Sequence, residues 1–216
     1  MISLTANRQY FHLHKQFRMK IGLYFGTFNP IHIGHMAIAN YMIEFSEIEQ
    51  LWFVVSPQNP FKTKSNLLAD IHRLRMVRFA IEDDERRFKA CNIEFGLPKP
   101  SYTIDTLIYL KDKYPEHEFF LIIGSDNLEY FQKWKNYEMI LENGHLLVYP
   151  RPGYDPGKWL EHPKIEMVDA PLIEISSSFI RKTIHKGKDI RHFLPFHTWE
   201  YLDKMNFYRS KKNKPE

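Results

Sequence analysis

The stretch Lys20 to Asn40, KIGLYFGTFNPIHIGHMAIAN, decides the fold that this sequence predicts. Its apolar beginning, Ile21 to Phe25, indicates a buried strand, and the spacing from about Gly34 to Phe45 indicates a helix. The turn between them, Gly26 to Pro30, contains the glycine and proline that tight turns favour. A strand, a turn and a helix start in this order bring free backbone N–H groups and the positive end of a helix to one point. We therefore expect an anion site there.

Two histidines, His32 and His35, lie where this turn becomes the helix. Their imidazole N–H groups can donate hydrogen bonds to a phosphate, and Gly26 would let a phosphate approach the backbone with no Cβ in the way. A histidine at a helix start can also serve only to cap or pack the helix. The turn lacks the glycine patterns of a P-loop and of a dinucleotide-binding fold, so neither of these two motifs explains it.

Apolar strand-like segments alternate with helical patterns along the rest of the chain. Further strands are expected at Leu51–Val55, Phe88–Phe95, Glu118–Ile123, His145–Tyr149 and Ile165–Val168. Helices are expected from an N-cap at Asp70 to about Glu82, from Ser101 or Thr103 to Tyr114, from Tyr137 to Glu142, from Ile175 to near Gly187, and from Pro195 through Met205. The alternation predicts an α/β fold, namely a Rossmann-like, doubly wound, mainly parallel sheet with a C-terminal helical cap. Ligands of such sheets bind beyond the carboxyl ends of the strands.

The chain has no internal linker, so residues 20–208 are expected to form a single domain. Residues 1–19 are polar and show no periodic apolar face, so we expect this extension to be dispensable, with Met19 as an alternative start. Residues 209–216 form a basic tail. The whole chain carries a net charge of +4, and residues 1–20 and 204–216 each carry +4 alone, so the residues between them carry −4. A mildly acidic body does not favour nucleic-acid binding.

Cys91 is the only cysteine, which excludes an intrachain disulfide and a zinc site built from several cysteines. We predict no metal site made by protein side chains. A single cysteine suits the reducing cytoplasm, where we expect the protein to act. No apolar run approaches ~20 residues, and residues 1–20 lack the apolar core of a secretory signal, so we expect no membrane partner. The sequence leaves open whether the chain forms homo-oligomers.

A second candidate phosphate site is the segment Ile175 to Arg181, ISSSFIR. Three serines at a helix start supply hydroxyl and amide donors, and Arg181 can reach back with a forked cation that suits phosphate. The same residues could simply form a serine-capped helix that carries a surface arginine. This second explanation is weaker when the segment Gly26 to His35, called the histidine turn below, is considered together with the serines.

The two motifs together resemble known enzymes. Residues 27–35, TFNPIHIGH, resemble the nucleotidyltransferase signature G-x-F-D/N-P-x-H-x-G-H, whose H-I-G-H half class I aminoacyl-tRNA synthetases share. The ISSSFIR segment is similar to the I-S-S-x-x-I-R signature of bacterial adenylyltransferases. Three further segments are similar to those of the bacterial nicotinate-nucleotide adenylyltransferases: SYTIDTL at 101–107, IGSD at 123–126 with a later Trp134, and RPG at 151–153. This resemblance covers about Lys20 to Tyr208.

The resemblance implies an enzyme of NAD biosynthesis that joins ATP and nicotinate mononucleotide to give nicotinate adenine dinucleotide and pyrophosphate. Mg²⁺ would travel with ATP. The family's motifs assign His32, His35 and Arg181 to catalysis on the transferring phosphates. They assign ATP phosphate binding to Gly26, Thr27, Phe28, Lys62, Ser176, Ser177 and Ser178, and mononucleotide binding to Tyr102, Thr103, Asp126, Trp134 and Arg151.

The sequence departs from the family pattern at three positions. Phe25 and Asn29 stand where many members have glycine and aspartate, and Phe61 replaces the histidine of the usual P-H-K loop.

Nicotinamide-mononucleotide and phosphopantetheine adenylyltransferases share both phosphate motifs, although SYTIDTL and Trp134 argue against the phosphopantetheine enzyme. A tRNA synthetase fragment would need a K-M-S-K-S-like loop, which is absent. A regulator that senses ATP without turnover is the alternative from another class.

Overall fold

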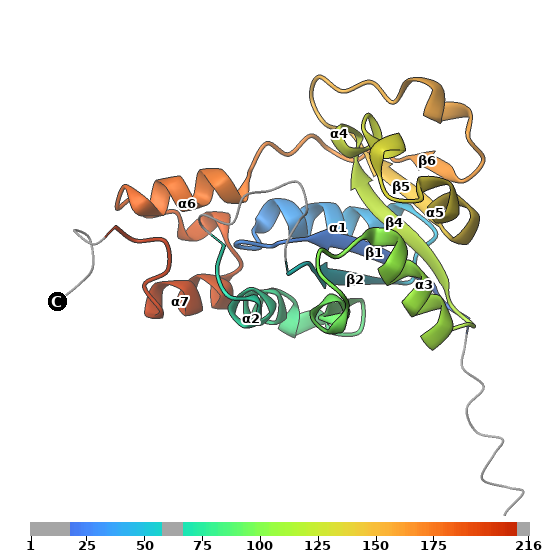
Figure 1. The fold of residues 1–216 in the computed structure, drawn as a ribbon. Helices are drawn as coiled ribbons and strands as arrows, with labels where there is room; N and C mark the ends of the chain where they lie inside the picture. The colour runs from blue at the N-terminus through green and yellow to red at the C-terminus, as the bar shows by residue number, and fades with distance from the viewer. Residues whose placement is uncertain (1–17, 58–66, 211–216) are drawn as a thin grey trace, which may run out of the picture.

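The computed structural model describes residues 18–57 and 67–210, which form a six-stranded sheet (Figure 1). All paired strands are parallel, and their order is β3-β2-β1-β4-β5-β6. The strands are β1 (Lys20–Gly26), β2 (Gln50–Val55), β3 (Phe88–Cys91), β4 (Glu118–Gly124), β5 (His145–Tyr149) and β6 (Ile165–Met167). Because β1 and β4 are neighbours at the centre, the chain winds outward from them in both directions. The predicted doubly wound, Rossmann-like fold is confirmed.

Helices cover both faces of this sheet (Figure 1). They are α1 (Ile33–Phe45), α2 (Asp70–Ile81), α3 (Thr103–Lys113), the short α4 (Ser125–Leu128), α5 (Tyr137–Asn143), α6 (Ser177–His185) and α7 (Phe196–Lys204). Side chains alternate along the central strands, which divides the core into two layers. Leu23 of β1 joins the layer of α3 and α5, whereas the next residue, Tyr24, joins the layer of α1 and α2.

The C-terminal helices α6 and α7 form a cap at the α2 side of the molecule, away from β6 (Figure 1). The buried Thr198 hydroxyl of α7 donates to the Met76 carbonyl of α2 at 3.0 Å, and Leu202 of α7 joins the core. The expected C-terminal helical cap is therefore present. No helix within residues 18–57 and 67–210 is both long enough and apolar enough to cross a membrane.

Three of the expected boundaries were wrong. The strand expected over Phe88–Phe95 ends at Cys91, because its neighbour β2 ends one residue beyond the last pair, and the 3-10 helix Ile93–Gly96 follows. Asp70 is the first residue of α2 rather than its N-cap, and its carboxylate accepts a hydrogen bond from Arg73 instead. Pro195 is the N-cap of α7 rather than its first residue.

Candidate active site

A cavity of about 420 Å³ opens at the carboxyl edge of the sheet. On one side it is lined by Gly26 and Thr27, which follow β1, and on the other by Tyr102, Thr103 and Trp134. Strands from the two halves of a doubly wound sheet diverge at such an edge, which is where ligands of these folds bind. The structure thus brings together two groups of residues that the sequence assigned separately to phosphate and to mononucleotide.

The turn after β1 is fixed by the ring of Phe28. A Cβ on Gly26 would lie 2.8 Å from this ring, so close packing requires glycine at position 26. Phe28 is buried, and its ring meets Tyr24 and Phe53 edge-on. Phe28 also has a φ of +42°, a conformation that bulky side chains seldom adopt. This packing gives a reason for Gly26 that the sequence did not reveal.

The two histidines lie against each other at the start of α1. His32 is the N-cap residue, its backbone N–H donates to His35 Nδ1 at 3.2 Å, and the ring centroids are 3.7 Å apart. Burial, together with the nearby Arg151 cation, lowers the pKa of His32 to about 4. At neutral pH His32 is therefore an uncharged imidazole with one N–H to donate.

The serine and arginine motif joins α6 to the turn that precedes α1. Ser177 Oγ donates to the Pro30 carbonyl at 2.8 Å, and Arg181 Nη1 donates to the Asn29 carbonyl at 2.8 Å. Arg181 Nη2 donates to Ser178 Oγ at 3.2 Å. The motif therefore lies beside the histidine turn. These contacts use two of the five N–H donors of the guanidinium, and the others can serve a ligand.

Ser176 has a structural role in this motif. It is the N-cap of α6, and its Oγ accepts a hydrogen bond from the Phe179 N–H at 3.2 Å. Ser176 therefore caps the helix, as serine often does. The hydroxyls of Ser177 and Ser178 instead bond to the Pro30 carbonyl and to Arg181.

The start of α3 forms the other wall of the cavity. Tyr102 is the N-cap residue of α3 and Thr103 is its first residue, so unpaired helix N–H groups lie at this wall. Trp134 is half-buried and packs edge-on against Phe131 at 5.4 Å between centroids. The Lys135 ammonium pairs with Asp105 and lies 4.7 Å from the Tyr102 ring centroid. Lys133 and Lys135 both line the cavity, although no motif in the sequence points to them.

Asp126 and Arg151 lie next to each other, at the histidine end of the site. Arg151 Nε is 3.9 Å from Asp126 Oδ1, and the Arg151 N–H donates to Ser125 Oγ at 2.8 Å. Arg151 lines a small recess together with His32 and His35, and it is not among the residues that line the large cavity. A Cβ on Gly124 would clash with Asp126 Oδ1, so glycine is required there for Asp126 to take this position.

Two buried charged residues near the site were not anticipated. Glu94 lines the cavity with 2% of its surface exposed, and its Oε1 accepts a hydrogen bond from the Thr106 hydroxyl at 2.8 Å. Burial raises the pKa of Glu94. Arg73 is completely buried beneath the turn after β1. The apolar spacing of the sequence carries no signal for either, because both depend on partners that are distant in the chain.

Lys62 lies outside the described residues. Within residues 18–57 and 67–210 no group of three His, Cys, Asp or Glu side chains could hold a metal ion. The cavity is therefore lined by ammonium, hydroxyl and backbone groups and by the buried Glu94, and the imidazole and guanidinium groups of the two motifs and of Arg151 lie beside it. Such donors suit a polyanionic ligand.

Comparisons with known proteins agree with this arrangement. Residues 23–183 match the cytidylyltransferase-like family. A probable nicotinate-nucleotide adenylyltransferase of Flavobacterium johnsoniae is 56% identical over 193 residues, covering 88% of this chain and 100% of the relative. A similarly named protein of Bacteroides fragilis is 50% identical, covering 82% of this chain and 88% of the relative.

Solved structures share the fold. The structure of Plasmodium falciparum nicotinic acid mononucleotide adenylyltransferase complexed with NaAD matches with a TM-score of 0.73 at 22% identity, covering 88% of this chain and 98% of that one. The fold, the two phosphate motifs and the close relatives agree with one another. The chain belongs to the nicotinate-nucleotide adenylyltransferase family of cytidylyltransferase-like proteins.

Proposed function

We propose that this enzyme transfers the adenylyl group of ATP to nicotinate mononucleotide, giving nicotinate adenine dinucleotide and pyrophosphate in NAD biosynthesis. The observation that carries the proposal is the position of the cavity, whose walls are the turn after β1 and the start of α3. Relatives about 50% identical to this chain bear the name of the same activity. We further propose that the enzyme acts in the cytoplasm, which suits its single cysteine.

The reaction needs positioning more than it needs a base. An oxygen of the mononucleotide phosphate attacks the α-phosphorus of ATP, and the bond from this phosphorus to the oxygen that bridges it to the β-phosphorus breaks. Pyrophosphate leaves with the electron pair of that bond. The attacking phosphate is already an anion, so no residue has to remove a proton from it. Fixed donors that face the equatorial oxygens should therefore supply most of the catalysis.

The described side chains suggest a role for each end of the triphosphate. We propose that the uncharged His32, His35 and the backbone of Thr27 and Phe28 bind the α- and β-phosphates. The remaining N–H donors of Arg181 would bind the β- and γ-phosphates, together with the adjacent serine hydroxyls. Lys62 would complete the site toward the incoming phosphate.

We propose that Mg²⁺ reaches the site bound to ATP. The protein donors near the turn are neutral or cationic, and the described residues offer no carboxylate cluster for a metal. This donor set fits an ion that keeps phosphate oxygens and waters as ligands. When bound, Mg²⁺ would offset charge on the nucleotide phosphates.

The wall of the cavity that contains Tyr102, Thr103 and Trp134 is called the mononucleotide wall below. Its charges support a preference for nicotinate mononucleotide over the corresponding amide. Lys133, Lys135 and the positive end of α3 make this side of the cavity favourable for a carboxylate. We propose that Tyr102 and Thr103 bind the carboxylate with their backbone N–H groups and that Trp134 stacks on the pyridinium ring.

A direct assay tests the proposal. The purified protein is incubated with ATP, Mg²⁺ and nicotinate mononucleotide, pyrophosphate is measured, and the dinucleotide product is identified by mass. We expect pyrophosphate and nicotinate adenine dinucleotide to appear in equal amounts and only when both substrates are present. ATP binding without pyrophosphate release would instead support a nucleotide sensor and refute the proposed activity.

A further inference from the structure

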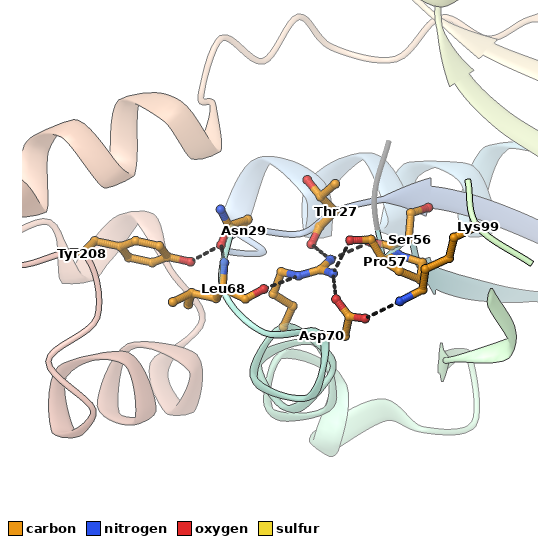
Figure 2. Close-up of polar contacts among 9 residues, drawn as sticks. Thr27, Asn29, Ser56, Pro57, Leu68, Asp70, Lys99 and Tyr208 are labelled. Carbon is orange, nitrogen blue, oxygen red and sulfur yellow. Dashed lines mark hydrogen bonds and ion pairs between the residues drawn. The ribbon is translucent and has the colours of Figure 1, made fainter. Parts of the chain in front are cut away.

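Arg73 of α2 is completely buried in a polar cluster under the site. Figure 2 labels its hydrogen-bond partners, which are Thr27, Ser56, Pro57, Leu68 and Asp70. All five of its N–H donors have acceptors. Nε donates to the Leu68 carbonyl at 3.0 Å, and Nη1 donates to the carbonyls of Thr27 at 2.6 Å and Ser56 at 2.7 Å. Nη2 donates to the Pro57 carbonyl at 3.1 Å and to Asp70 Oδ1 at 2.6 Å.

These acceptors belong to three separate segments at the carboxyl edge of the sheet. Thr27 follows β1, Ser56 and Pro57 follow β2, and Leu68 precedes α2. Thr27 and Ser56 also line the large cavity. One planar cation therefore fixes the direction of backbone carbonyls from the segments after β1 and after β2 at once, which a flexible or apolar side chain could not do.

The cluster continues toward the mononucleotide wall. The second oxygen of Asp70 lies 3.8 Å from the Lys99 ammonium, just before the segment that opens α3 (Figure 2). On the opposite side, Asn29 Oδ1 accepts hydrogen bonds from the Leu68 N–H at 3.3 Å and the Tyr208 hydroxyl at 2.6 Å. The turn after β1 is thus held both by its Thr27 carbonyl and by the Asn29 side chain.

The hydrogen bond to Thr27 has a consequence for Phe28. In a trans peptide the C=O and the next N–H point in opposite directions, so the Phe28 N–H is directed away from Arg73. None of the described residues accepts a hydrogen bond from this N–H. Phe28 holds a φ of +42°, which persists only where surrounding contacts determine it. The hydrogen bond from Arg73 to the Thr27 carbonyl is one such contact, and it sets the direction of the Phe28 N–H.

Stability alone does not explain why a cation occupies this position. Burial lowers the pKa of Arg73, which reflects the cost of removing a guanidinium from water. Replacing a buried ion pair and its partners together with apolar side chains is often neutral or stabilising in proteins, whereas removing Arg73 alone would leave Asp70 and four carbonyl groups without their donor and would destabilise the fold. What an apolar residue cannot reproduce here is the common orientation of four carbonyl groups.

We propose that Arg73 is a positioning residue for adenylyl transfer, which fixes the Thr27–Phe28 peptide so that the Phe28 N–H faces the transferring phosphates. This inference rests on the proposed function. It adds a residue that does not itself touch the substrate and acts only through the backbone of the turn.

Two substitutions and one matched control test the proposal. Arg73→Lys keeps the charge but offers three donors to five acceptors, and Arg73→Met removes all donors. The control is Val77→Ala, one helical turn further along α2, which removes buried apolar contacts without touching the cluster. For each protein kcat and both KM values are measured with ATP, Mg²⁺ and nicotinate mononucleotide, and the rates are divided by the folded fraction from circular dichroism.

We expect kcat per folded molecule to fall about 100-fold in Arg73→Met and at least about 10-fold in Arg73→Lys, because a misdirected donor loses most of its effect on the transition state. Val77→Ala should keep kcat within about twofold of wild type despite a lower melting temperature. The proposal is overturned if Arg73→Lys keeps kcat within threefold, if Val77→Ala loses as much as Arg73→Lys, or if neither Arg73 variant folds where Val77→Ala does. An inactive wild-type chain would refute the proposed function itself.

Discussion

The uncharged state of His32 predicts a specific loss of stability in acid. Burial lowers the pKa of His32 from 6.5 to about 4. Between these values the unfolded chain binds a proton at His32 and the folded chain does not, so the free energy of unfolding falls as the pH falls. Because one pKa unit corresponds to 1.36 kcal/mol, this residue should remove ~2.5 kcal/mol of stability between pH 7 and pH 4.5.

Urea unfolding of three proteins at these two pH values measures the effect. His32→Gln removes the titrating group and should lose ~2.5 kcal/mol less stability in acid than wild type. The exposed His192 provides a control, and His192→Gln should lose as much as wild type. Other groups titrate in all three chains, so only the difference between them is interpreted. Equal losses in wild type and His32→Gln would show that His32 is not held as a neutral imidazole.

Three further predictions concern other parts of the chain. His35→Ala and Arg181→Ala should each lower kcat by about 100-fold in steady-state assays, the cost of losing a preorganised donor, and near-wild-type turnover in either folded variant would contradict the assigned role. Trp134→Ala should raise KM for nicotinate mononucleotide by roughly 5- to 10-fold, since a cation–π contact is worth about 1 kcal/mol, and should leave KM for ATP within twofold. A chain that begins at Met19 should keep its melting temperature and activity, and a loss of either would show that the preceding residues stabilise the body.

Most of the fold could be predicted because its signals are local. The continuous apolar run of β4 and the helical spacing that follows β1 indicate a buried strand and a covering helix without reference to the rest of the chain. The boundaries that were wrong depend on neighbours. β3 stops at Cys91 because β2 stops, and the pattern of residues 88–95 contains no information about β2.

The candidate site could be predicted only in part. The histidine turn and the serine–arginine segment have characteristic spacings, so their residues were identified before their contacts were known. Arg73 and Glu94 were missed because an arginine or glutamate in an amphipathic pattern usually faces water. Their burial depends on carbonyl and hydroxyl partners from distant segments, such as Thr27 for Arg73 and Thr106 for Glu94.

A competition between the two pyridine mononucleotides measures how strongly the cavity prefers the acid over the amide. Nicotinate mononucleotide and its amide are supplied at equal concentration with ATP and Mg²⁺, and the ratio of the two dinucleotide products gives the ratio of kcat/KM. A site that offers N–H donors and cations to a carboxylate should favour the acid by roughly 5- to 150-fold, which corresponds to 1–3 kcal/mol for a mispaired buried group. Equal amounts of the two products, or an excess of the amide product, would contradict the account of the mononucleotide wall.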